Sequence, residues 1–167
     1  MTTFKFKKST ANVNQTSVIE AGAYVAVVIQ VANIGLQKFA PDDVPVAKMA
    51  VVFETASGEF VTKDMAYSDH PKSHCHALFV AAFPDLDDEE CELDELLGKS
   101  VLIEVEVKNK KWPKVTEIMR LEEGFDPIDP KTELLMFDVE KMDNETYLKL
   151  HPDVRSWISK RIRHSQT

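Results

Sequence analysis

Residues 97–121 constrain the fold more than any other stretch of this sequence. From Val101 to Val107 every second residue is apolar, and the residues between them include Glu104 and Glu106. This period of two is typical of a β-strand that buries one face. A turn rich in lysine follows. The residues after the turn predict a second strand that runs back beside the first.

Three more strands are predicted nearer the N-terminus. They are residues 22–33, 46–54 and 59–67. We expect Gly35 and residues 40–45 to break the pattern, so that residues 34–45 form a long loop, whereas Ser57-Gly58 supplies a tight turn. One face of the first strand is expected to hold Val25, Val27, Ile29 and Val31. The register of the third strand stays open, because Phe60 and Thr62 compete with Val61, Lys63, Met65 and Tyr67 for the inner face.

Helical spacing replaces the alternation in two places. Residues 71–83 predict a helix, with Leu78, Ala81 and Ala82 three to four residues apart. Residues 125–130 contain two prolines and predict a rigid extended linker. Residues 131–142 give a mixed pattern, and residues 143–163 predict a C-terminal helix.

The order of these elements predicts the fold class. Three short strands, one helix and two further strands are typical of a mainly β protein, a five-stranded OB-fold-like barrel with the helix between strands three and four. The expected organisation is an N-terminal arm (1–21), the barrel (22–124), and a linker with a C-terminal helical tail (125–167). The main alternative is an α+β domain with an open antiparallel sheet.

The charge of this chain is concentrated in one segment. The formal net charge is −8, and residues 81–98 carry eight acidic side chains and no basic one. The rest of the chain is therefore neutral overall, and its local basic patches remain candidates for an anionic partner. Two interpretations of the acidic segment stay open, a solvated helix surface and a site for a partner protein.

An OB barrel binds its ligand on strands two and three and on the two loops beside them. In this sequence those loops are residues 34–45 and 108–114. The expected binding residues are Lys38, Lys48, Lys63, Tyr67, Lys108, Lys110, Lys111, Trp112 and Lys114. Cations along a path with exposed aromatic rings suit single-stranded nucleic acid. The alternative is that Trp112 caps the barrel and that the lysines protect a hairpin tip from aggregation.

The chain also resembles a known family, the small OB-fold proteins of phage and prophage replication modules that are considered single-stranded-DNA-binding proteins. The resemblance rests on Glu20-Ala21-Gly22 with Tyr24, Ile34-Gly35-Leu36-Gln37, Val52-Phe53-Glu54, Tyr67-Ser68 with His70, Leu97-Gly98-Lys99, Phe137-Asp138, and Trp157-Ile158 with Arg161-Ile162 and Ser165. It implies non-enzymatic DNA binding in replication or recombination, with replication or recombination proteins as possible partners. Two departures are the cation-free segment His74–Leu78 and the absence of an acidic C-terminal tip that ends in Phe.

No other chemistry stands out in the sequence. His70, His74, Cys75 and His76 could ligate zinc, but no Cys-x-x-Cys pair accompanies them, so we expect neither a metal nor another cofactor. No nucleophile or carboxylate motif indicates an enzyme. No apolar run reaches membrane-spanning length and no signal sequence is evident, so we expect a cytoplasmic protein, in the host bacterium if phage-encoded, that does not bind a membrane. Whether it forms a homo-oligomer stays open.

Two functions therefore remain open at this point. The first is binding of single-stranded DNA through the residues given above. The second is an OB-fold adaptor that binds proteins through acidic residues 85–95 or through the C-terminal helix, with Trp157 and Ile158 at the contact.

Overall fold

A computed structural model gives the structure of this protein, and it describes residues 19–38, 40, 42–68, 70–84 and 92–161. The described chain is mainly β. Its strands are β1 (Gly22–Gln37), β2 (Val46–Thr55), β3 (Phe60–Ala66), β4 (Ser100–Lys108), β5 (Trp112–Met119) and β6 (Leu135–Asp138). Its helices are α1 (His74–Ala82), α2 (Asn144–Lys149) and α3 (Pro152–Ser159), with short 3₁₀ turns η2 (Leu93–Leu96) and η3 (Val139–Lys141).

The strands form one sheet in the order β3-β2-β1-β4-β5, and β6 pairs with β1 in parallel. The order of three strands, one helix and two strands was predicted from the sequence and is confirmed. The sheet is open, since no strand pairing among the described residues joins β3 to β5. The mainly β prediction is confirmed and the sheet is compatible with a barrel-like fold, although the two edge strands face each other without a hydrogen-bonded ladder.

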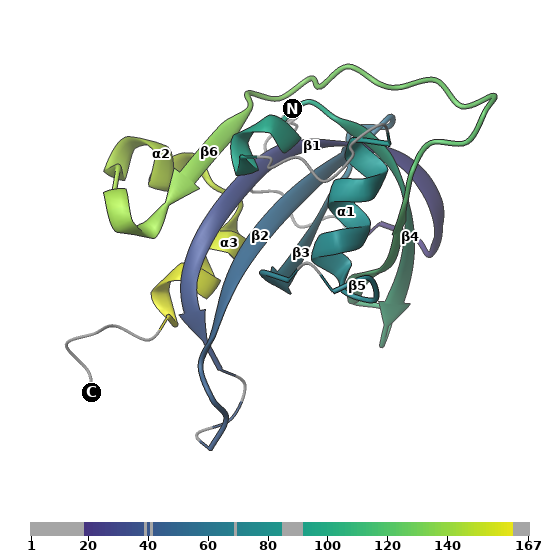
Figure 1. Cartoon of the computed structure of the whole chain (residues 1–167). Coiled ribbons are helices and arrows are strands. Elements are labelled where there is room, and N and C mark those ends of the chain that lie inside the picture. Colours follow the sequence, from purple (N-terminus) through teal and green to yellow (C-terminus); the bar gives the residue numbers. More distant parts are fainter. Residues whose placement is uncertain (1–18, 39, 41, 69, 85–91, 162–167) are drawn as a thin grey trace, which may run out of the picture.

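Strand β1 is the centre of the sheet and curves strongly (Figure 1). Its first half pairs with β4 and its second half pairs with β6, while β2 runs along most of its length. Gly35 was expected to break this strand, but it lies within it at φ 77°, next to a β-bulge that bends the chain. A second bulge, between Val28 and Gln30, reverses the alternation. Val31 therefore shares a core with Val28 and not with Val27, contrary to the sequence prediction.

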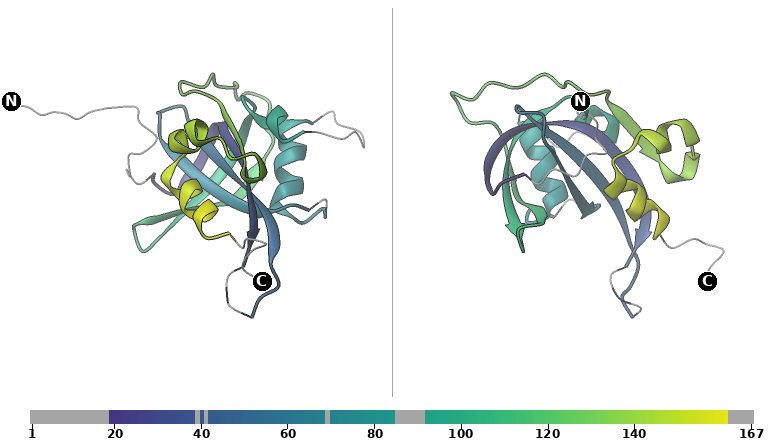
Figure 2. Two further views of the ribbon diagram at one scale, coloured as in Figure 1. Left: turned by 90° about the vertical axis from the view of Figure 1, so that its left-hand side faces the viewer. Right: turned by 180° about the vertical axis from the view of Figure 1, so that it is seen from behind.

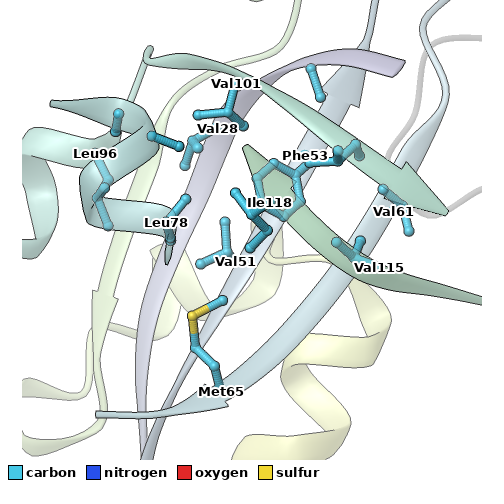
Figure 3. Packing of buried hydrophobic residues seen from close by; sticks show 14 of the residues in the cluster. Val28, Val51, Phe53, Val61, Met65, Leu78, Leu96, Val101, Val115 and Ile118 are labelled. Atoms are coloured by element: carbon cyan, nitrogen blue, oxygen red, sulfur yellow. The ribbon is translucent and has the colours of Figure 1, made fainter. Parts of the chain in front are cut away.

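The concave face of the sheet is covered by α1 and holds the larger core, which we call the inner core (Figure 1). Val28, Val51 and Phe53 meet Leu78 of α1 and Leu96 of η2 there, as Figure 3 shows. The alternation predicted for β4 is confirmed, since its odd-numbered valines and isoleucine enter this core while its glutamates are exposed. This core fixes α1 against β4 and β5.

The opposite face of the sheet is covered by β6, α2 and α3 (Figure 2). Leu150, Val154 and Ile158 are buried there against Ile29 and Ile34 of β1, in a second cluster that we call the outer core. The predicted single helix over 143–163 is divided in two, because Pro152 begins α3 after an extended Leu150 and His151. The C-terminal segment is thus an integral layer of the fold.

No helix within the described residues is long and apolar enough to span a lipid bilayer.

Candidate nucleic-acid-binding groove

The β4–β5 hairpin turns through residues 109–111, since Lys108 at the end of β4 pairs with Trp112 at the start of β5. Asn109 and Lys110 have φ angles of 52° and 59°, and the backbone N–H of Lys111 donates to the carbonyl of Lys108 at 3.0 Å. These angles fit a type I′ turn, which matches the twist of a hairpin. The loop predicted over residues 108–114 is therefore too long, and Trp112 and Lys114 belong to strand β5.

Trp112 lies on the surface of β5, with 65% of its area exposed. Lys114 is two residues further on the same strand and is exposed as well, whereas Val115 enters the inner core. Trp112 belongs to neither cluster of buried residues, so its burial gives no support to the alternative that it caps the barrel. An exposed indole beside a lysine is available to a ligand.

Three neighbouring pockets follow the exposed edge of β3, and together we call them the β3–β5 groove. The loop pocket lies beside residues 42–46, the central pocket lies between β3, β5 and the start of α1, and the tryptophan pocket lies between β5 and α3. Their volumes are about 390, 440 and 420 Å³. Adjacent pockets share Lys48 and Ala66, or Lys63, Asp64 and Lys114.

The lining of the groove is more basic than the chain as a whole. It contains Lys38, Lys48, Lys63, Lys114 and Lys160, together with Asp43, Asp64 and Asp153. Each aspartate already has a hydrogen-bond donor within the protein, namely Ala40, Lys48 and Thr62 in that order. By contrast, no carboxylate of the described residues lies within salt-bridge distance of the Lys63 or Lys114 ammonium group.

The groove is positively charged and partly shielded from water, and this lowers the pKa of two of its groups. Burial lowers the pKa of Lys63, as do the nearby charges of Lys114 and Lys48, while Asp64 acts in the opposite direction. Burial also lowers the pKa of His74, with Lys63 and Lys114 adding to the effect. Like charges at such a site favour the binding of an anion, because a negative group relieves their repulsion.

Helix α3 forms one wall of the tryptophan pocket and is held firmly in place. The Thr62 hydroxyl donates to a carboxylate oxygen of Asp153 at 2.8 Å, which ties β3 to the start of the helix. The Gln37 side chain donates to the Trp157 carbonyl at 2.7 Å, and Ile158 is buried in the outer core. As a result Trp157 and Trp112 line the same pocket from two different elements.

The structure brings five of the predicted binding residues into this groove, namely Lys38, Lys48, Lys63, Trp112 and Lys114. It leaves four outside, namely Tyr67, Lys108, Lys110 and Lys111. Burial raises the pKa of Tyr67, and so do the carboxylates of Asp138 and Glu140, so its hydroxyl faces an acidic environment. The three lysines lie exposed at the hairpin tip.

The sequence analysis missed His74, Trp157 and Lys160 as groove residues. Trp157 and Lys160 stand three residues apart, a spacing that places both on one side of a helix, and this was the available signal. His74 was visible only as part of a histidine-rich segment considered for zinc. Among the residues that the structure describes, no group of three or more His, Cys, Asp or Glu side chains could hold a metal ion.

Comparison with known proteins adds no identification. No protein-family model matches this chain, and no curated protein matches it either.

Proposed function

We propose that this protein binds single-stranded DNA without enzymatic activity, in the manner of the phage replication and recombination proteins that its sequence resembles. The observation that carries the proposal is the β3–β5 groove, in which two tryptophans and several lysines from separate elements line one path. Aromatic rings stack with bases regardless of sequence, and ammonium groups pair with phosphates.

The strand order supports an OB-type architecture as part of this proposal. In an OB barrel β1 pairs with β2 and β4, and the far edges of the sheet are β3 and β5. The present sheet has this order, with α1 between β3 and β4 in the sequence. The groove lies where such a barrel would close, so that its ligand would occupy the gap between the two edge strands.

In the groove, the tryptophans and the lysines would contact different parts of the bound DNA strand. Trp112 and Trp157 would stack with bases in the tryptophan pocket, each stacked base contributing about 1–3 kcal/mol. Lys63, Lys114 and Lys160 would neutralise phosphates, so that affinity falls as salt rises. A strand held in this way could be presented to replication or recombination proteins, and self-association would lengthen the path.

The adaptor hypothesis has less support from the described residues. Ile158, one of the two residues expected at its contact surface, is only 1% exposed because it packs against the sheet. Of the acidic segment 85–95, residues 85–91 lie outside the described residues.

The test is a titration of fluorescent dT oligomers with the full chain at two salt concentrations. We expect saturable binding that weakens steeply with salt, and quenching of tryptophan fluorescence by the oligomer. The double variant Lys63→Gln, Lys114→Gln should bind more weakly. The matched control is Lys141→Gln, Lys149→Gln, which removes the same charge from the η3 and α2 side and should bind like the parent protein.

Equal affinity of both double variants would refute the groove as the binding site. Absence of binding to DNA and to the matching RNA oligomer at low salt would refute the function itself, and the adaptor hypothesis would then be tested next.

A further inference from the structure

The central pocket of the groove has features that DNA binding in general does not require. Its lining residues come from β2, β3, α1 and β5, and among them are Lys48, Lys63, Asp64, His74 and Lys114. Its volume of about 440 Å³ lies in the range of small-ligand sites.

Lys63 occupies a position in β3 that the strand pattern reserves for an apolar residue. Val61 and Met65, two positions before and after it in the sequence, are 2% and 4% exposed and belong to the inner core. Side chains two residues apart point to the same side of a strand. The Lys63 side chain therefore leaves β3 on its core-facing side, and Lys63 is one of the residues that line the central pocket.

The charges around this pocket do not balance. Asp64 accepts a hydrogen bond from Lys48 at 2.8 Å, so one lysine and one aspartate neutralise each other. Lys63 and Lys114 remain, and they have no carboxylate of the described residues within salt-bridge distance. The excess of about two positive charges matches a dianion better than it matches the single charge of a phosphodiester.

We propose that the central pocket is a binding site for a phosphate monoester, held by Lys63, Lys114 and His74. Among phosphate monoesters, we assign the terminal phosphate of a DNA strand to this pocket, because the rest of the strand would lie along the groove. This assignment rests on the proposed function. The Ser73 hydroxyl also lines the pocket, although it already donates to the carbonyls of Ser68 and His70 and caps α1.

Proton uptake should accompany binding at this site. Burial, Lys63 and Lys114 lower the pKa of His74, while a hydrogen bond with the backbone of Thr116 acts in the opposite direction. Lys48 and Asp64 are the other charged groups that line the pocket. A bound dianion stabilises the protonated imidazole, so it should raise the pKa of His74 and bind more tightly as the pH falls through that pKa.

The experiment compares dT oligomers with a 5′-phosphate, a 3′-phosphate or no terminal phosphate, together with inorganic phosphate and sulfate. Sulfate is included because it stays dianionic while a phosphate monoester gains a proton near pH 6. The readouts are affinity and the NMR titration of the His74 imidazole, which is assigned with His74→Gln. We expect one terminal phosphate to improve affinity by about tenfold, and both free anions to raise the pKa of His74.

Lys63→Met is the variant that tests the site. The substitution removes the positive charge, and methionine suits a strand position that faces the core. It should abolish the preference for a terminal phosphate while the protein stays folded. If oligomers bind equally with and without the phosphate and the anions leave His74 unchanged, the inference is wrong although DNA binding stands. If the anions shift His74 but no oligomer binds, the anion site stands and the proposed function fails.

A third outcome would also overturn the inference. Charged side chains that point inward on an edge strand can serve to prevent pairing between molecules. If Lys63→Met causes self-association and leaves anion binding unchanged, Lys63 protects the β3 edge and does not hold a ligand.

Discussion

The hairpin tip and the β3–β5 groove both carry lysines, but they are built in different ways. At the tip, Lys108, Lys110 and Lys111 lie within four residues of sequence and are exposed. In the groove, Lys63 and Lys114 come from the two edge strands, and α3 supplies a wall that is anchored in the outer core. The tip is conspicuous in the sequence, whereas the groove exists only in the folded chain.

This difference shows where binding energy can be concentrated. A charge in high-dielectric solvent contributes little to any one contact. A charge that is partly desolvated and close to another charge of the same sign interacts strongly with an incoming anion. The lowered pKa of Lys63 indicates that the groove has this second character. The following predictions compare the two regions, beginning with the largest expected effect.

Removal of the α3 anchor should have the largest effect. Ile158→Ala leaves a cavity in the outer core and should lower the free energy of unfolding by about 2–5 kcal/mol. Chemical denaturation measures this loss. The exposed Leu148 of α2, which is 67% exposed, supplies the control, and Leu148→Ala should change stability by less than about 0.5 kcal/mol. Similar losses for both variants would show that α3 is not a fixed wall.

Truncation of the exposed indole should have the next largest effect. Trp112→Ala removes a ring that is not part of either core, so stability should hardly change. Affinity for oligo-dT should fall by about 5- to 150-fold, which corresponds to the loss of one stacked base. Phe125→Ala is the matched control, because Phe125 is also an exposed aromatic residue, at 47%, and lies outside the groove. Equal affinity of the two variants would exclude stacking at Trp112.

The two groove lysines should determine much of the salt dependence. In the double variant Lys63→Gln, Lys114→Gln, the slope of log affinity against log salt concentration should be smaller in magnitude by about 1.4. Each phosphate contact on a single strand contributes about 0.7 to this slope. Affinity at low salt should fall by about tenfold. An unchanged slope would mean that these lysines do not contact phosphates.

The fold was predictable from sequence to the extent that its signals are local. Four of the strands and α1 begin or end within about three residues of their predicted positions. The signals that predicted them, the period of two in the strands and the helical spacing of Leu78, Ala81 and Ala82, each lie within one segment. The bulges in β1 were not predictable, since one inserted residue reverses the faces without changing composition. β6 was missed because four residues, Leu135–Asp138, are too few to show a period.

The candidate site was predictable only in part, for a related reason. A cluster of lysines and a tryptophan within seven residues can be seen in the sequence, and it includes Trp112 and Lys114, which the structure places in the groove. The pairing of Trp112 with Trp157 depends on where the C-terminal segment folds, and tertiary contacts such as Thr62 with Asp153 decide that. Lys63 was among the expected binding residues, but its position in the same pockets as Lys114 appears only when β3 and β5 are placed side by side.

Loss of charge at the hairpin tip should have the smallest effect. The variant Lys110→Gly, Lys111→Gln removes two positive charges, and glycine at residue 110 relieves a lysine held at φ 59°. Asn-Gly is the preferred pair in a type I′ turn, so stability should rise by up to about 1 kcal/mol. Binding to oligo-dT should weaken by only about twofold, mainly through slower association. Stopped-flow mixing separates the two rates, and the groove variant Lys63→Gln, Lys114→Gln carries the same change in charge. If the tip variant loses more affinity than the groove variant, the bound DNA strand must cross the hairpin. The tip, and not the groove, would then contribute more of the binding energy.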